Sequence, residues 1–170
     1  MSLIRQKVKF DKKLLDQDAL KVLKKLTKSG YESYLVGGCI RDILLGHKPK
    51  DFDIATNATP EQIHKLFKRS RIIGRRFKLV HIMCSARKFI EVATFRAGKV
   101  KTSNDGLVIR DNYYGSLKDD VFRRDFTVNG LYYDINKSEV IDYVGGLKDL
   151  KILLTCSGVA LVAISKSLGL

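Results

Sequence analysis

The stretch Val36–Ile54, VGGCIRDILLGHKPKDFDI, restricts what this chain can fold into more than any other segment. A short apolar run ends in Gly37 and Gly38. Glycine lacks the Cβ that would keep phosphate oxygens away from the backbone, so the pair predicts a nucleotide-phosphate contact. If residues 51–55 form a strand, Asp51 and Asp53 point to the same side and can share divalent cations. The stretch therefore predicts metal-assisted chemistry at a phosphate.

The residues between the glycines and the aspartates fit a short helix. Tyr34–Val36 is predicted to be a buried strand, and Ile40–Leu45 a helix that ends at Gly46. The glycine pair would then lie at the positive N-terminal end of that helix. Arg41 is one turn into the helix and can fork onto phosphate oxygens, whereas Asp42 could instead hold the arginine or cap the backbone.

Composition favours a polyanionic partner. The formal net charge is +14 in 170 residues, and clustered Lys and Arg bind phosphates with release of counterions. Nucleic acid is the leading partner, because no apolar run is long enough to span a bilayer and no basic amphipathic membrane helix is evident. The three cysteines lack metal-site spacing and the chain shows no secretory signal, which favours reduced thiols in a cytoplasmic protein and argues against zinc.

The first half of the chain contains a basic arm and an amphipathic helix. Residues 1–12 lack a periodic pattern and are expected to lie on the domain or on nucleic acid. From about Lys13 apolar residues recur at helical spacing until Gly30, and the lysine-rich face of this helix is either solvated or an RNA contact. Thr59 and Gln62 predict a capping box for a helix from Pro60 to Lys68.

A basic stretch and two strands follow. Six of the eleven residues from Lys68 to Lys78 are Lys or Arg. Leu79–Cys84 and Phe89–Phe95 are predicted to be paired strands, and Glu91 lies inside the second one. Alternation alone leaves two possibilities for this carboxylate: it points into solvent, or it completes a trio with the two aspartates.

The last third carries another charged block. Residues 97–115 are predicted to form a mobile loop over the site. Ser116 is then predicted to cap a helix over residues 118–133. Within it, Arg123, Arg124 and Asp125 are either an exposed helix end with local salt bridges or part of the site. Residues 131–135 and 139–143 resemble a hairpin, after which Gly145 and Gly146 turn the chain. No repeat or linker divides the region, so one domain is expected over residues 13–151.

These motifs together resemble a known superfamily. The order V-G-G, R-D-x-L-L-G and D-F-D-I is similar to the nucleotidyltransferase signature. Further blocks, TNATPEQIHKLF, IEVATFR and FRRDFTVNGLYY, look like the head domain of bacterial poly(A) polymerase, a relative of the class II CCA-adding tRNA nucleotidyltransferases. The resemblance covers about residues 30–151, and GRRFKLVHI and IRDNYYGSL favour the polymerase over the tRNA enzyme.

The resemblance implies an α/β (α+β) fold, with a small mixed β-sheet flanked by helices, and a set of functional residues. Asp51 and Asp53 match the metal-binding aspartates, and Glu91 is taken as the third catalytic and metal-binding carboxylate. The implied cofactor is a pair of Mg²⁺ ions, and the implied substrate is ATP. The residues implied to bind the nucleotide are Gly37, Gly38, Arg41, Asp42, Arg123, Arg124, Asp125 and Asn129.

The implied function is template-independent addition of AMP from ATP to RNA 3′ ends. CCA addition to tRNA and a non-catalytic RNA-binding fragment are the alternatives. In the family a neck domain with an E-D-x-x-R block reads the base, whereas here residues 152–170 form an apolar tail that departs from the family. We expect this tail, the product of truncation or a frame change, to pack on the surface that the neck would cover or to be poorly ordered, and the chain to select among nucleotides weakly.

Overall fold

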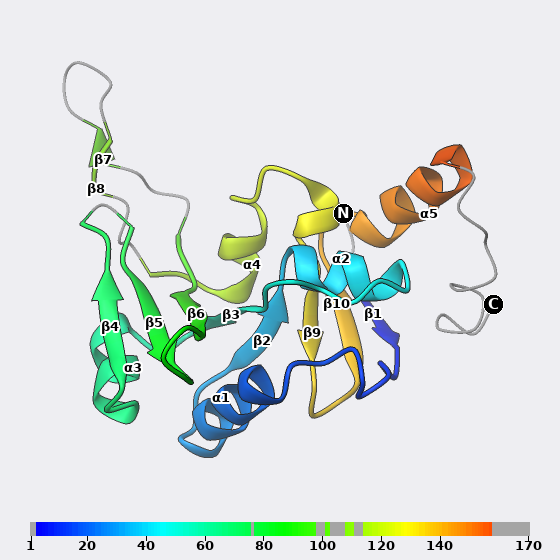
Figure 1. Ribbon diagram of the computed structural model, residues 1–170. Helices are drawn as coiled ribbons and strands as arrows, with labels where there is room; N and C mark the ends of the chain where they lie inside the picture. Colours follow the sequence, from blue (N-terminus) through cyan, green and yellow to red (C-terminus); the bar gives the residue numbers. More distant parts are fainter. Residues whose placement is uncertain (1–2, 76, 98–100, 103–107, 111–113, 158–170) are drawn as a thin grey trace.

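The fold is built on one large mixed sheet (Figure 1). The computed structural model describes residues 3–75, 77–97, 101–102, 108–110 and 114–157. Eight strands are arranged in the order β1-β10-β9-β2-β3-β6-β5-β4, and every neighbouring pair is antiparallel except β3 and β6. The strands are β1 (Ile4–Lys7), β2 (Ser33–Val36), β3 (Asp53–Thr56), β4 (Ser70–Ile73), β5 (Leu79–Met83), β6 (Phe89–Thr94), β9 (Tyr132–Asp134) and β10 (Glu139–Asp142).

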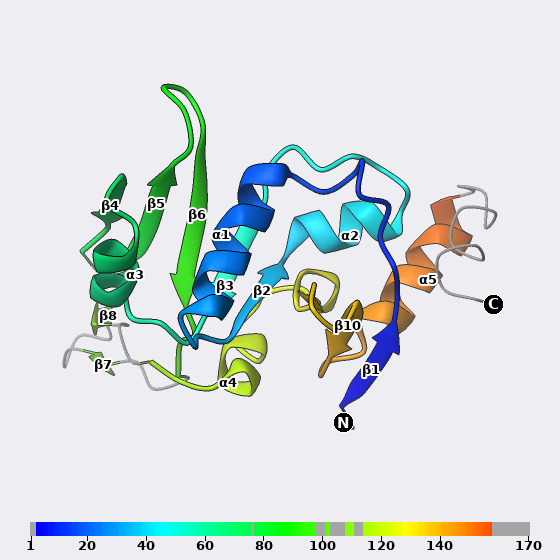
Figure 2. The same ribbon diagram turned by 90° about the horizontal axis from the view of Figure 1, so that it is seen from below.

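Helices cover the two faces of this sheet unequally (Figure 2). Buried side chains of α1 (Gln17–Lys28), α2 (Gly38–Leu44) and α3 (Pro60–Leu66) join the main core on one face. The opposite face holds a smaller cluster, to which α4 (Leu117–Val121) contributes. A 3₁₀ turn, η1 (Thr127–Asn129), precedes β9, and α5 (Gly146–Ser157) follows β10. The mixed sheet flanked by helices confirms the predicted fold class.

Helix α1 starts later than the sequence pattern predicted. Asp16 is the N-cap, and its carboxylate accepts the Asp18 and Ala19 N–H groups at 2.8 and 3.1 Å. The predicted start of the helix at about Lys13 is therefore wrong. Leu15 fits the apolar period, but it is buried ahead of the helix rather than in it. Gly30, with φ of 85°, ends the helical region as expected.

The basic arm, residues 1–12, lies on the domain in the part that the structure describes. Ile4–Lys7 pairs antiparallel with β10 as the edge strand β1. Behind it, Val8 is buried, and the ring of Phe10 stacks on that of Tyr133 with centroids 4.1 Å apart. The arm thus belongs to the sheet and the core, which a lysine-rich sequence without a clear period did not reveal.

Several predicted elements are confirmed, and others differ. The capping box of α3 is present, although the helix ends at Leu66 rather than at Lys68, and β5 pairs with β6 as expected. The basic stretch contains the unpredicted strand β4, whose mostly exposed residues lack the alternation of a half-buried strand. The predicted hairpin forms from β9 and β10.

The helix predicted over residues 118–133 is much shorter. Helix α4 ends at Val121, and the chain reaches β9 through an irregular turn and η1. In the predicted loop, residues 98–100, 103–107 and 111–113 lie outside the described residues, and Lys101–Thr102 pairs with Val108–Arg110 as β7 and β8. The predicted tail begins inside α5, which continues to Ser157, and residues 158–170 lie outside the described part.

Within the described residues, no helix has the length and apolarity needed to cross a bilayer.

Asp142 ties the end of the sheet to α5. The residue is only 1% exposed. Its Oδ1 accepts the N–H groups of Val144, Gly145 and Gly146 at 2.8–3.1 Å. The second oxygen, Oδ2, accepts the Leu147 N–H at 2.9 Å. The bonds from Gly146 and Leu147 satisfy the first two N–H groups of α5, which have no partner within the helix itself.

We predict that Asp142→Ala lowers the free energy of unfolding by about 2–4 kcal/mol, because several buried N–H groups lose a charged acceptor. Thermal and urea unfolding measure the change. Asp11→Ala is the control, since Asp11 is exposed and accepts one N–H, from Lys13, so its loss should cost less than about 0.5 kcal/mol. Equal effects of the two substitutions would contradict this role for Asp142.

Candidate active site

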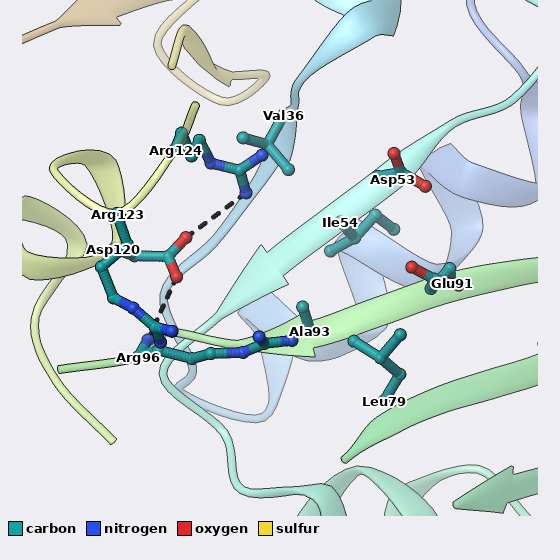
Figure 3. Close-up of a pocket in the computed structure, with 10 residues that line it drawn as sticks. All are labelled: Val36, Asp53, Ile54, Leu79, Glu91, Ala93, Arg96, Asp120, Arg123 and Arg124. Carbon is teal, nitrogen blue, oxygen red and sulfur yellow. Dashed lines mark hydrogen bonds and ion pairs between the residues drawn. The ribbon is translucent and has the colours of Figure 1, made fainter. Parts of the chain in front are cut away.

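Two carboxylates lie side by side at the centre of the sheet. Strands β3 and β6 are parallel, and Asp53 is the direct partner of Glu91 in their register. Partners on adjacent strands project from the same face, so both carboxylates leave the sheet on the face opposite the main core. Figure 3 shows the two side chains extending from neighbouring strands in this way. Glu91 therefore lies on the same face of the sheet as Asp53, and its role as a third metal ligand stays a prediction.

Asp51 is placed differently from the prediction. Strand β3 begins at Asp53, so residues 51–55 are not all extended in the sheet and the two aspartates are not held as alternate residues of one strand. The chain is still entering from the connection after α2 at this point, where Pro49 and Phe52 are buried and Asp51 is exposed. Asp51 is nevertheless close enough for its negative charge to act on Asp53.

The carboxylates repel one another. The Asp53 side chain opens into the site, yet enough water is displaced around it that desolvation is the largest cause of its raised pKa. The charges of Glu91 and Asp51 raise the pKa further, whereas Arg124 lowers it. A divalent cation would relieve this repulsion, and carboxylate oxygens are the ligands that Mg²⁺ prefers.

The donor set therefore fits a hard cation, although its ligands are not fully gathered. Among the described residues, no three His, Cys, Asp or Glu side chains lie close enough together to form a metal-binding group. Asp53 and Glu91 are the pair that the sheet itself positions. Asp51, outside the strand, lines the second pocket together with both of them, and the predicted trio stays a prediction.

The glycine pair lies beside these carboxylates. Gly37 is buried and has φ of 81°, and a Cβ there would lie 3.9 Å from Asp53 Oδ2 and 3.6 Å from Arg124 Nη1. At Gly38 a Cβ would approach the guanidinium of Arg41 to 3.3 Å. The glycine pair therefore lies next to both arginines, and its contact with a nucleotide phosphate stays a prediction.

Arg41 is held in place from two sides. Asp42 Oδ1 accepts its Nε–H and Nη2–H at 2.9 and 2.7 Å, and Asn129 Oδ1 accepts its Nη1–H at 3.1 Å. Of the two roles predicted for Asp42, the structure has the one in which it holds the arginine. Asn129, 88 residues away in sequence, joins the same cluster.

A second cluster positions Arg124. Asp120 is only 8% exposed and accepts hydrogen bonds from the Tyr132 hydroxyl and, at 3.4 Å, from Arg124 Nη2–H. The Nε–H of Arg124 donates to the Tyr132 hydroxyl at 2.9 Å. Burial is the main cause of the raised pKa of Tyr132, which keeps its hydroxyl protonated. Asp120 also accepts the backbone N–H of Arg96 at 3.1 Å. Figure 3 shows Arg96, Asp120 and Arg124 across the pocket from the carboxylates.

Two pockets meet at the carboxylate pair. The first, of about 270 Å³, extends from Asp53 and Glu91 toward Arg96, Arg123 and Arg124. The second, of about 480 Å³, extends from the same carboxylates toward Lys50, Asp51 and the residues 87–90. Along β6, Glu91 lies between them, with residues 87–90 on one side and Ala93 and Arg96 on the other.

Most of the predicted site residues are brought together, and some partners were missed. Asp125 is exposed, accepts the N–H of Phe126 at 2.9 Å and is not among the residues lining the first pocket. Asp120, Tyr132 and His81 were not predicted. The spacing of Asp120 and Arg124, four residues apart, was the available signal for the first. His81 could not be found without the register that places it opposite Glu91, to which its Nε2 bonds at 3.2 Å.

We predict that Asp53→Asn raises the melting temperature of the Mg²⁺-free chain at pH 7, because it removes a carboxylate repelled by its neighbours. Since the folded pKa of Asp53 lies above the unfolded value of about 3.9, the destabilisation is present above the folded pKa and is lost as the pH falls through it. The gain should therefore shrink in melts at acidic pH. Mg²⁺ should stabilise the parent chain more than the variant. Glu32→Gln, an exposed carboxylate outside the site, should produce neither effect.

Comparisons with known proteins identify the family of this chain. The family model described as the poly(A) polymerase head domain matches residues 33–154. Poly(A) polymerase I of Escherichia coli O6:H1 is 51% identical over 156 residues, which are 86% of this chain and 33% of that protein. The CCA-adding enzyme of Bacillus pumilus is 38% identical over 133 residues, covering 78% of this chain and 32% of the enzyme.

A solved structure shares the fold. The Bacillus stearothermophilus CCA-adding enzyme in complex with CTP superposes with a TM-score of 0.62 at 35% identity, over 79% of this chain and 31% of that one. The chain spans about a third of the length of the relatives it matches. By sequence and by structure, the chain belongs to the poly(A) polymerase head domain family.

Proposed function

We propose that this chain transfers AMP from ATP to the 3′ end of RNA without a template. The observation that carries the proposal is the Asp53–Glu91 pair, which the parallel register fixes at the junction of two pockets. Family membership and the +14 charge support a nucleotide donor and an RNA acceptor. The substrates proposed here are those of relatives that are about three times as long as this chain.

The donor nucleotide is assigned to the side of Asp53 that carries the glycines and the arginines. Backbone at Gly37 and Gly38 accepts close approach of phosphate oxygens, and Arg41 and Arg124 supply fixed positive charge. Both guanidiniums are already bound by neighbouring groups, so they lose little side-chain entropy when an anion arrives. Arg123, which lines the first pocket, and the exposed Asp125 are assigned to the ribose and triphosphate region.

The reaction would be an in-line displacement at the α-phosphorus. The 3′ oxygen of the RNA forms a bond to that phosphorus while the bond to the pyrophosphate oxygen breaks, and the hydroxyl proton leaves to solvent. Asp53 and Glu91, together with Asp51, would hold Mg²⁺, which lowers the pKa of the attacking hydroxyl and neutralises charge on the leaving group. Arg124 and Arg41 stabilise negative charge on the phosphate oxygens as the bond order changes.

CCA addition to tRNA is the second candidate. It is favoured by the 38% identity to a CCA-adding enzyme and by the structural match to a relative that binds CTP. The higher identity to poly(A) polymerase I, 51%, favours AMP transfer. A non-catalytic RNA-binding fragment is the third possibility, and it predicts binding without transfer.

We predict that Asp53→Ala reduces primer extension with labelled ATP at least about 100-fold, because it removes a carboxylate assigned to hold Mg²⁺ at the reacting phosphate. Glu91→Gln should have an effect of similar direction if Glu91 is the third ligand. A thermal melt of each variant checks that the fold is retained, and Glu32→Gln serves as the control that keeps activity. Retained extension by Asp53→Ala would refute its assignment.

Nucleotide selection distinguishes the candidates. We expect the 170-residue chain to extend an RNA primer with ATP and to discriminate weakly among ATP, CTP, GTP and UTP in parallel reactions. Incorporation of CTP on a tRNA that lacks its CCA end would instead favour the second candidate. Absence of incorporation with every nucleotide, combined with retained RNA binding, would leave only the fragment.

A further inference from the structure

Among the described residues, no helix covers one part of the site face. On β4, β5 and β6 the core-facing residues Val80, Ile82, Ile90 and Val92 are buried beneath helices. The residues of the same strands that face the carboxylates are exposed or only half-buried. We call this surface the shelf and define it by Arg71, Ile73, Leu79, His81, Met83, Phe89, Glu91 and Ala93.

An aromatic platform lies on the shelf next to the carboxylates. The rings of Phe89 and His81 stack with centroids 4.1 Å apart and planes 13° from parallel. Phe89 is nevertheless 47% exposed, so the stacked imidazole leaves much of this residue accessible to solvent. His81 also bonds to Glu91, which joins the platform directly to the proposed catalytic group.

Positive charge continues from the platform toward the edge of the sheet. Arg71 on β4 is the direct partner of His81, which is the partner of Glu91, so the three side chains form a row across adjacent strands. Two strand spacings place the start of the Arg71 side chain about 10 Å from that of Glu91. Arg71 is exposed, and the exposed Arg69 precedes β4.

The second pocket borders the platform at Phe89, and neither His81 nor Arg71 lines it. Phe89, Glu91 and Asp53 line it, and Lys50 and Arg87 add exposed positive charge at its wall. Lys88 also lines it, but its ammonium is already paired with Asp16 and Asp18 at 2.7 and 2.8 Å and is not counted toward a ligand. The proposed donor contacts, Gly37, Gly38 and Arg124, do not line this pocket.

We infer that the shelf binds the 3′-terminal nucleotides of single-stranded RNA, with a base stacked on Phe89 and the backbone near Arg71. The inference rests on the proposed function. In-line displacement needs the attacking oxygen and the leaving group on opposite sides of the phosphorus, and the second pocket is the open space on the far side of the carboxylates from Arg123 and Arg124. An exposed ring beside arginines is the combination that binds single strands without reading sequence.

Stacking is tested with an oligoadenylate that carries 2-aminopurine at its 3′ terminus. Binding to the 170-residue chain should quench 2-aminopurine emission, because the terminal base stacks on Phe89. Phe89→Ala should abolish that quenching and weaken binding at least about fivefold, while Phe89→Trp should preserve both. Phe122→Ala is the matched control, since Phe122 is equally a phenyl side chain, 55% exposed, at the end of α4 and off the shelf.

The backbone contact is tested by salt dependence of the same binding. Arg71→Ala should reduce the slope of log K against log salt by about 0.7, as expected when a single strand loses one phosphate contact. Lys65→Ala removes the same charge from α3, which packs on the other face of the sheet, and should leave the slope unchanged. Equal slopes for the two variants would overturn the assignment of Arg71.

Failure of this inference is distinguishable from failure of the proposed function. ATP binding, followed with a fluorescent ATP analogue, should be the same in the parent chain and in Phe89→Ala. If the parent extends primers but Phe89→Ala binds RNA with unchanged affinity and quenching, the platform is wrong and the transfer function stands. If the parent fails to bind the oligonucleotide, the inference is overturned. A change in sedimentation of Arg71→Ala without any change in RNA binding would mark the shelf as a contact between copies of the chain instead.

Discussion

The pairing of β3 with β6 is the constraint on which the rest of the site depends. It is the one parallel ladder among the described strands of the large sheet, and it places Asp53 beside Glu91. The same ladder places Ile54 beside Val92 on the opposite face, where both are fully buried. A slip of one residue in either strand would put a carboxylate into the core and an aliphatic side chain into the site. The hydrophobic core therefore enforces the position of the acidic pair.

This arrangement places like charges next to each other, and the fold offsets the repulsion only in part. Arg124 lowers the pKa of Asp53 and acts against the effects of desolvation, Glu91 and Asp51. Arg124 is itself fixed by Asp120 and Tyr132, one from α4 and one from β9. The short helix α4 thus has an electrostatic role as well as a packing role. A cation bound between the carboxylates would offset the remaining repulsion and stabilise the folded chain.

Local sequence chemistry predicted the parts of the site that lie within one segment. The glycine pair and Arg41 follow from a steric and an electrostatic requirement, and the capping box of α3 from its spacing. Alternation along β6 identified Glu91 but not the face to which it points. The face depends on pairing with β3 and β5, whose partners are far apart in sequence.

The incorrect predictions also arise where tertiary packing, rather than the local sequence, decides the structure. Asp51 and Asp53 look equivalent in D-F-D, but only tertiary pairing decides that β3 starts at the second of them. Strand β4 was missed because, as an edge strand with mostly exposed residues, it carries little hydrophobic pattern. The helix after Ser116 was drawn too long because the apolar residues beyond Val121 serve η1 and β9 rather than a helical face.

The two sides of the carboxylate pair differ in a way that suits the proposed reaction. On the donor side, guanidiniums are fixed by partly buried hydrogen bonds to Asp42, Asn129 and Asp120. On the shelf, the platform is half exposed and offers a ring face rather than directional donors. A donor that is the same in every cycle benefits from preorganised contacts. An RNA end that becomes the new acceptor after each addition must shift by one nucleotide, and base-tolerant stacking permits that shift at a smaller cost than breaking buried hydrogen bonds.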